Sequence, residues 1–313
     1  MEDNLRWTLI TAIAPVAWGT NYYVIHEYLP AGHPLWGALL RALPAGLLLL
    51  AVCRRLPRGP WWWRSLVLGA LNMGAFFALI YTSAQLLPTS VASTIMASSP
   101  VVMMLIAWAL LGERPRLLAS AGAVLGVTGV CLMLFSGVSA VNWWGVAASV
   151  TAMLMSSLGF VLTKRWGSDT SVLASTSWQL VAGGLVLAPF AVLVEGAPPA
   201  MDWAAVAGFA YVAVVATAVA FAAWFAGLKY LRAGTVGLIG LLNPATGVLL
   251  GTLLAAEVLT LRQAAGLGLV LAGILLGQPV AERLRARLRP RPAAPATPRR
   301  EAHAEAGGGR PSR

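Results

Sequence analysis

The residues most able to do chemistry in this sequence are a few polar and aromatic side chains inside long apolar segments, and Arg41 is the clearest of them. It lies about seven residues, or roughly 10 Å along a helix, from the outer end of the segment 35–53. A central arginine costs about 2.5–3.5 kcal/mol on membrane-insertion scales, so we expect its charge to be compensated. Two interpretations stay open: a structural link to backbone carbonyls or to Tyr and Asn side chains, and attraction for an anionic group on a substrate.

Two prolines inside apolar segments have polar neighbours at helical spacing. Thr94 and Ser98 share a helix face just before Pro100, and Asn243 directly precedes Pro244. Proline removes a backbone donor and frees a carbonyl group, which inside a membrane needs a water-lined cavity or protein neighbours. These two positions are the best pointers to a central binding site, with kinked packing that contacts no ligand as the alternative.

Aromatic and polar side chains in other apolar segments extend the same lining. Trp18, Asn21 and Tyr22 fall on one face of the first segment at spacings of three and four. The further candidates for substrate binding share this character: Phe77, Tyr81, Ser157, Phe160, Gln179, Phe221 and Trp224. Rings with few hydrogen-bonding groups suit small, partly apolar organic solutes, and simple packing is the alternative for any single ring.

No constellation in the sequence points to catalysis. There is no GxSxG, P-loop, HExxH or paired-carboxylate motif, and the histidines lie in an outer loop region or in the C-terminal tail. Cys53 and Cys131 form no CxxC pair and have no neighbouring histidine, which argues against a disulfide or a metal site. We therefore expect no enzyme, no catalytic residue, no metal and no cofactor.

The composition requires a membrane to hold these segments. Of the 313 residues, 58% are hydrophobic and 11% are charged, with a mean hydropathy of +0.76, whereas soluble domains carry about 25% charged residues. A span needs about 20 apolar residues. The sequence predicts an all-α membrane protein of ten transmembrane helices, at 8–26, 35–53, 65–84, 90–111, 117–135, 142–163, 171–194, 203–225, 233–255 and 262–280.

Lysine and arginine residues gather on one side of these spans, and the opposite side holds only Arg262. The cations of the basic side are Arg6, Arg54, Arg55, Arg58, Arg64, Arg114, Arg116, Lys164, Arg165, Lys229, Arg232 and the nine arginines of the tail. The positive-inside rule then predicts a bacterial inner-membrane protein with both termini in the cytoplasm. The net charge of +11 does not indicate nucleic-acid binding, because the cations lie in short loops and one tail rather than across a folded face.

The two halves of the chain repeat. Positions match at an offset of 144 residues in Pro100–Pro244, Glu113–Glu257, Gly122–Gly266 and Gly129–Gly273, and at an offset of 138 in Arg41–Gln179 and Gly46–Gly184. Five spans per half is an odd number, so the second half is inverted in the membrane, an architecture that recurs in transporters. We expect repeats at 1–136 and 137–280 and a disordered cytoplasmic tail at 281–313. The basic tail either contacts anionic lipid headgroups or serves as a passive topological anchor.

Several segments resemble the EamA-type ten-helix members of the drug/metabolite transporter superfamily. They are AWGTNYYV (17–24), ALLRALPAGLLLL (38–50) and SSPVVMMLIAWALLGERP (98–115) in the first half, and LTKRW (162–166), SWQLVAGG (177–184) and LLNPATGVLLGTLLAAEVLT (241–260) in the second. The first half also looks like the pigment and metabolite exporter branch. The resemblance implies two inverted EamA-type repeats, a central cavity walled by helices 1, 3, 4, 6, 8 and 9, and transport out of the cell.

The expected function is a secondary transporter that exports small organic metabolites or drug-like compounds by alternating access. An amino-acid exporter of the same family and a non-transporting membrane scaffold or sensor are the alternatives. Glu113 and Glu257 close helices 4 and 9 and have either a structural or a proton-carrying role. Since no acidic residue lies at mid-depth in a span, proton coupling, exchange and facilitated diffusion all stay open.

GxxxG spacings occur in the last span of each half, at Gly122–Gly126 and Gly273–Gly277. Such spacings indicate close helix packing, either within one chain or between two. The sequence is therefore compatible with a monomer or a homodimer.

Overall fold

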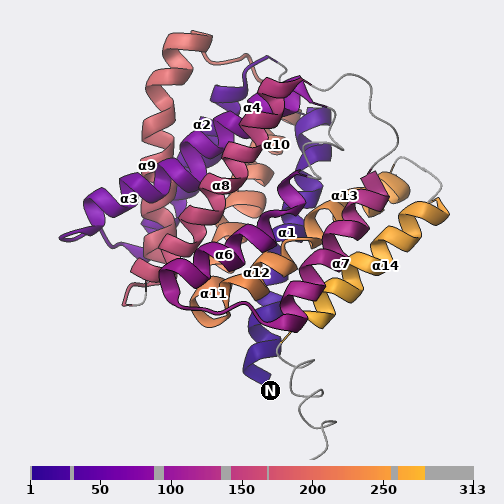
Figure 1. Cartoon of the computed structure of the whole chain (residues 1–313). Coiled ribbons are helices and arrows are strands. Elements are labelled where there is room, and N and C mark those ends of the chain that lie inside the picture. The colour runs from indigo at the N-terminus through magenta and orange to yellow at the C-terminus, as the bar shows by residue number, and fades with distance from the viewer. Residues whose placement is uncertain are drawn as a thin grey trace, which may run out of the picture.

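The computed structural model describes residues 2–28, 32–87, 95–134, 142–167, 169–254 and 260–278, and every labelled element in these ranges is helical (Figure 1). The helices account for the ten predicted spans and confirm the all-α fold. In chain order the spans are α1 (Glu2–Tyr28), α2 (Pro34–Cys53), α3 with η1 and α4 (Trp61–Gly69, Ala70–Gly74, Ala75–Leu86), α6 (Ser99–Leu111), α7 (Leu117–Leu134), α8 (Trp143–Trp166), α9 with η2 (Val172–Phe190, Ala191–Glu195), α10 with η3 and α11 (Trp203–Ala213, Val214–Val219, Ala220–Tyr230), α12 with α13 (Ala233–Ile239, Leu242–Leu254) and α14 (Leu261–Leu276).

Length and apolar character mark many of these helices as membrane spans. Among the described residues, five are long and apolar enough to cross a bilayer by that measure alone: Pro34–Cys53, Trp61–Ile80, Trp143–Trp166, Val172–Glu195 and Trp203–Tyr230. Thr94, Glu257 and the tail at 281–313 lie outside the described residues.

Spans 3 and 8 each contain one π-helical turn, which the apolar periodicity did not predict. The turn η1 separates α3 from α4, and η3 separates α10 from α11. The 144-residue offset carries Ala70, the first residue of η1, onto Val214, the first residue of η3. The two halves thus share a local backbone feature that is frequent at functional sites.

The ninth span is interrupted, whereas the sequence predicted one continuous helix over 233–255. The helices α12 and α13 meet at Gly240. Pro244 has no N–H to donate to the Gly240 carbonyl one turn earlier, and the Asn243 N–H donates to that carbonyl instead, at 3.0 Å. In the first half, α6 likewise begins beside Pro100 after a turn. Both prolines mark a break in their span.

The helices pack in a pattern that the inverted repeat explains. Equivalent spans face each other across the halves: α2 packs on α9, α7 on α14 and α6 on α12. Other contacts occur as related pairs, because α1 packs on α11 as α8 packs on α4, and α1 packs on α13 as α8 packs on α6. This pairwise exchange is the contact pattern of two repeats related by an approximate two-fold axis.

Glycines bring the equivalent helices into backbone contact. A Cβ atom on Gly273 of α14 would lie 2.5 Å from the Gly122 carbonyl oxygen of α7, and one on Gly129 would lie 2.6 Å from the Gly266 oxygen. The offset of 144 exchanges these two contacts with each other. The GxxxG segments therefore pack within one chain, the first of the two arrangements that the sequence allowed.

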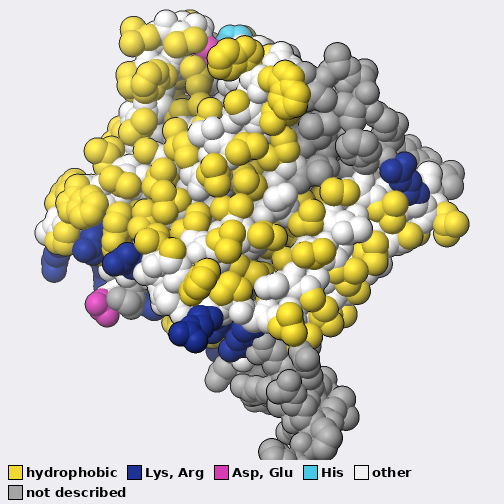
Figure 2. All heavy atoms as spheres, viewed as in Figure 1, with side chains coloured by type: hydrophobic (Ala, Val, Ile, Leu, Met, Phe, Trp, Pro, Cys, Tyr) yellow, Lys and Arg dark blue, Asp and Glu magenta, His cyan; other side chains and the backbone are white. Residues whose placement is uncertain are grey.

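The outer surface has the layered character of a membrane protein. Figure 2 shows hydrophobic side chains over the middle of the bundle and most Lys and Arg side chains along its lower edge, which we call the basic side. Trp62, Trp143, Trp144 and Trp203 are exposed, as indole rings are in interfacial belts. Trp61 instead is buried against Trp178, with ring centroids 5.4 Å apart.

Candidate functional site

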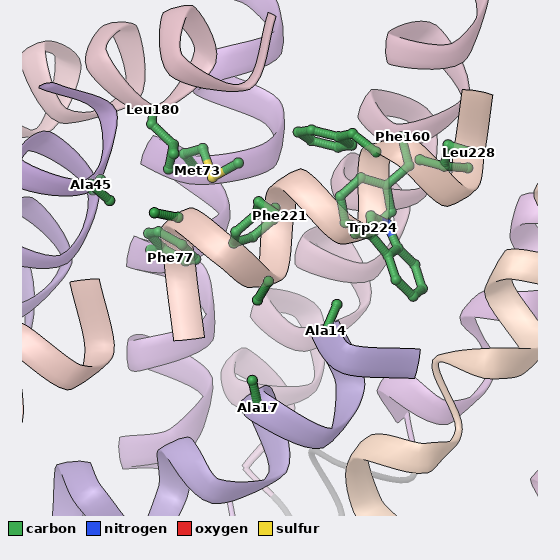
Figure 3. Packing of buried hydrophobic residues seen from close by; sticks show 14 of the residues in the cluster. Ala14, Ala17, Ala45, Met73, Phe77, Phe160, Leu180, Phe221, Trp224 and Leu228 are labelled. Carbon is green, nitrogen blue, oxygen red and sulfur yellow. The ribbon is translucent and has the colours of Figure 1, made fainter. Parts of the chain in front are cut away.

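Aromatic rings from spans 1, 3, 6 and 8 meet in the middle of the bundle. Trp18 of α1 lies with its ring centroid 5.0 Å from Phe221 and 5.2 Å from Trp224, both of α11. Phe160 of α8 lies 5.5 Å from Trp224, and Phe77 of α4 lies 6.3 Å from Phe221. Figure 3 shows Phe77, Phe221, Trp224 and Phe160 following one another across the interior. We call these five rings the aromatic cluster.

The members of the aromatic cluster come from both halves and include a pair related by the repeat. The offset of 144 carries Phe77 onto Phe221, and these two rings meet edge to face. They therefore mark the region where the repeats adjoin, which is where inverted-repeat transporters place their substrate sites.

Arg41 lies beside the aromatic cluster. Its guanidinium carbon is 4.4 Å from the centre of the Phe77 ring, and only 8% of the residue is exposed. The Arg41 Nε donates to Thr217 Oγ1 at 2.8 Å, and Nη2 donates to the Ala216 carbonyl at 3.3 Å. The Trp18 Nε1–H donates to the same carbonyl at 3.1 Å. We call Arg41 with Ala216 and Thr217 of η3 the arginine node.

Gln179 belongs to a different network, although its position matches Arg41. It is fully buried, and its Oε1 accepts from Asn72 Nδ2 at 2.7 Å and from Thr163 Oγ1 at 3.3 Å. Asn72 lies on η1, so this network pairs α9 with η1 as the arginine node pairs α2 with η3. We call it the amide node. Asn72 and Thr217 were not among the residues singled out from the sequence, although each is a polar residue within an apolar span.

Three buried polar atoms near the aromatic cluster have no hydrogen-bond partner among the described residues: Trp224 Nε1, Ser157 Oγ and Asn243 Oδ1. Ser157 precedes Phe160 by one helical turn on α8. Asn243 follows Gly240, where a Cβ atom would lie 3.2 Å from the Trp224 ring. Buried polar atoms in folded proteins nearly always have a partner, so these atoms are available to a polar group of a ligand.

The remaining predicted site residues are distributed as follows. Pro100 packs against α12, because a Cβ atom on Gly237 would lie 3.0 Å from its Cα. Ser98 lies in the turn before α6, and Pro244 lies in the first turn of α13. Four other predicted residues have side chains outside the described part of the structure: Asn21, Tyr22, Tyr81 and Thr94.

A set of polar contacts joins helix ends at the basic side of the bundle. Glu113, at the end of span 4, forms an ion pair with Lys164 of α8, with 2.7 Å between Oε1 and Nζ. The other Glu113 oxygen accepts from the Ala233 N–H at 3.0 Å, and Lys164 also donates to the Leu231 carbonyl. We call this set the basic-side lock. It fastens the ends of α6, α8 and α11 and the start of α12 to one another.

A bundle of two inverted repeats, with aromatic rings and unpartnered polar atoms at their junction, has the architecture of a secondary transporter. The sequence matches the EamA-like transporter family twice, over residues 5–135 and 143–277. The chain belongs to this family of multi-pass membrane transporters, and it is not an enzyme.

Known relatives cover most of the chain. It is 35% identical over 269 residues to Protein PecM of Dickeya dadantii, covering 85% of this chain and 90% of that protein. It is 27% identical to the uncharacterized transporter YvbV of Bacillus subtilis (87% and 91% covered) and 23% identical to the uncharacterized inner membrane transporter YedA of Escherichia coli K12 (83% and 87% covered). A solved crystal structure matches the fold with a TM-score of 0.78 at 19% identity, covering 89% of this chain and 98% of the other.

Proposed function

We propose that this transporter exports small, partly aromatic organic metabolites across the bacterial inner membrane by alternating access, with its basic side facing the cytoplasm. The observation that carries the proposal is the aromatic cluster at the junction of the repeats, with Arg41 at one end and the unpartnered Trp224 Nε1 within it. The positive-inside rule supports the orientation. The YedA relative is named an inner membrane transporter, and this name supports the proposed location.

The chemistry of the site supports this class of cargo. Stacked and edge-to-face contacts with several rings favour a flat, apolar body, and few polar atoms are available to fix its orientation. Small-molecule sites typically combine such apolar walls with a small number of placed polar groups. An export direction is consistent with the resemblance to metabolite exporters.

The basic-side lock supports an alternating-access mechanism. Glu113, Lys164, Leu231 and Ala233 hold the basic-side ends of four spans together, which is the arrangement expected of a state that is closed to the cytoplasm. In an inverted repeat, exchange of conformation between the two halves opens the side that was closed and closes the other. Cargo then enters from the cytoplasm when the lock parts.

An efflux experiment tests the proposal. Cells with and without the protein are loaded with a panel of aromatic metabolites, amino acids and toxic organic compounds, and the release of each compound is measured. For an exported compound, Trp224→Phe is expected to lower the efflux rate about three- to tenfold, because it removes one hydrogen-bond donor worth about 0.5–1.5 kcal/mol. The exposed Trp62 provides the matched control, and Trp62→Phe is expected to leave efflux unchanged.

Two results would count against the proposal. One is a protein that is present in the membrane and changes the release of no compound in the panel. The other is a reporter fused after residue 278 that gives a periplasmic rather than a cytoplasmic signal, which would reverse the orientation and hence the role of the lock.

A further inference from the structure

Three unpartnered polar atoms near the aromatic cluster restrict the chemistry of the cargo. Trp224 Nε1 carries a hydrogen and can only donate, whereas Asn243 Oδ1 can only accept. Ser157 Oγ can do either. A cargo that satisfies these atoms must therefore offer both a hydrogen-bond acceptor and a hydrogen-bond donor. This inference rests on the proposed function, because it concerns what the same transport site can hold.

Burial gives these unpartnered atoms their weight. Trp224 is 3% exposed and Ser157 is fully buried, and the Asn243 oxygen is itself shielded from solvent. An unpaired polar atom in such surroundings costs about 1–3 kcal/mol. The neighbouring hydroxyl of Thr246 avoids this cost within its own helix, because it donates to the Leu242 carbonyl at 2.8 Å. A bound ligand would remove the same cost at the three unpartnered atoms.

Asn243 approaches the Trp224 ring from the break in span 9. A Cβ atom on Gly240 would lie 3.2 Å from the edge of that ring, and the Asn243 N–H donates to the Gly240 carbonyl. On the facing helix α1, a Cβ atom on Gly19 would lie 2.8 Å from the Asn243 carbonyl oxygen. The next residue, Trp18, has its ring centroid 5.2 Å from that of Trp224. Asn243 therefore adjoins the part of the aromatic cluster that α1 and α11 form.

Ser157 approaches the same ring from α8. It precedes Phe160 by one helical turn, and the Phe160 ring centroid lies 5.5 Å from that of Trp224. The offset of 138 carries Gly19 onto Ser157, and α8 packs on α6 as α1 packs on α13. Ser157 thus occupies in its half the position that Gly19 occupies beside Asn243. Polar atoms from both halves therefore adjoin the Trp224 ring.

We propose that the cargo is a flat ring compound that carries both a hydrogen-bond acceptor and a hydrogen-bond donor, such as a cyclic amide or a hydroxylated aromatic carbonyl compound. Trp224 Nε1 donates to its carbonyl oxygen, and Asn243 Oδ1 accepts from its N–H or O–H group. A site built to bond a polar group rejects an analogue that lacks this group, because the buried partner is then left unpaired. Trp224 and Asn243 are therefore specificity-determining residues.

Matched analogues test the two contacts in the native protein. Each compound whose protein-dependent release the efflux panel detects is compared with two counterparts, one with its donor methylated and one without its carbonyl group. Oxindole, N-methyloxindole and indoline form one such set. Both counterparts are expected to leave the cell about three- to tenfold more slowly than the parent compound, in line with the loss of one hydrogen bond.

Two variants assign each contact to its residue. Asn243→Leu removes the acceptor at similar volume, so the preference for the parent over its methylated counterpart is expected to disappear while the preference over the carbonyl-free counterpart remains. Trp224→Phe is expected to do the reverse. Thr246→Val is the matched control on α13, because its hydroxyl already has a partner within the helix, and both preferences are expected to remain.

Three results would overturn the inference. Equal release of all three members of a set would do so while leaving transport itself in place. Retention of both preferences in Asn243→Leu or in Trp224→Phe would show that the residue does not contact the cargo. If the panel detected no release at all, the proposed function would fall and this inference with it. The comparison of analogues in the native protein needs no variant, so the inference can fail even where a variant does not fold.

Discussion

The arginine node and the amide node occupy the same place in the two repeats but make different contacts. In each, a polar residue of the second span of a half reaches a π-helical turn of the other half's third span. Arg41 meets Ala216 and Thr217 on η3, whereas the equivalent positions on η1 are Asn72 and Met73. The small residues of η3 leave room for a guanidinium, and the larger residues of η1 fill that space and supply an amide partner.

The difference shows how the same backbone, present in both halves, can hold a charged node in one place and a neutral node in the other. The arginine node places a positive charge against Phe77 of the aromatic cluster. The amide node is neutral, fully buried and joined to Thr163 of α8, so it fastens three helices together. We infer that substrate recognition is concentrated on one side of the two-fold axis and structural support on the other.

The largest effect is expected when both nodes carry a charge. Gln179→Arg is expected to reduce the amount of folded protein sharply, since a buried charge without compensation costs about 3–5 kcal/mol. Adding the small residues of η3 to η1, in N72A/M73T/Q179R, is expected to restore part of the folded protein. Membrane abundance and detergent melting temperature measure both effects. A well-folded Gln179→Arg single variant would show that the residues of η1 do not determine the difference.

Making both nodes neutral should affect transport rather than folding. Arg41→Gln copies the amide residue into the arginine node, where Thr217 and the Ala216 carbonyl can still accept its amide hydrogens. Efflux of an anionic cargo is expected to fall about tenfold or more, because charge-assisted hydrogen bonds are worth about 1.5–3 kcal/mol. Membrane abundance should stay near that of the native protein. Unchanged efflux would show that Arg41 does not recognise the cargo, and loss of the protein itself would assign Arg41 a structural role.

The mildest change removes one support of Arg41 and keeps its charge. Thr217→Val deletes the oxygen that accepts from Arg41 Nε, while the Ala216 carbonyl remains as an acceptor. We expect efflux to fall only about two- to fivefold, in line with the loss of one hydrogen bond of about 0.5–1.5 kcal/mol. Thr163→Val at the amide node is the matched control and should lower the melting temperature with little effect on efflux. Identical behaviour of the two variants would remove the distinction between the nodes.

Most of the architecture could be predicted from the sequence, because a bilayer imposes a simple rule on composition and span length. The spans, the repeat offsets and the correspondence of Arg41 with Gln179 could all be predicted in this way. Pro100 and Pro244 were expected to free a backbone carbonyl, because a missing N–H has a local effect, but the interruption of the helix at Gly240 was not predicted. The glycine spacings indicated close packing, and the structure supplied the partner helix.

Other features could not be predicted because apolar periodicity is nearly uniform in a membrane protein. A helix that faces lipid on one side and protein on the other is apolar on both sides. The hydrogen-bond partners of Arg41 and Gln179 therefore could not be identified from the pattern of apolar residues. The π turns η1 and η3 shift the register of the helices that follow them. They share no proline or glycine signal, because η1 ends at Gly74 whereas η3 contains neither residue type. The positive-inside rule alone was enough to explain Lys164 from the sequence. Its ion pair with Glu113 could not be predicted, because the two residues are remote in sequence.

The glycine contacts between α7 and α14 have a mechanical consequence. An added methyl group on Gly273 would lie 2.5 Å from a backbone oxygen of the facing helix, so no side chain separates the two backbones at this point. We expect this close contact between α7 and α14 to be retained while other contacts between the halves change. The interrupted backbones beside Pro100 and Pro244 are the compliant elements, so motion between the halves is expected to be a rocking about this contact.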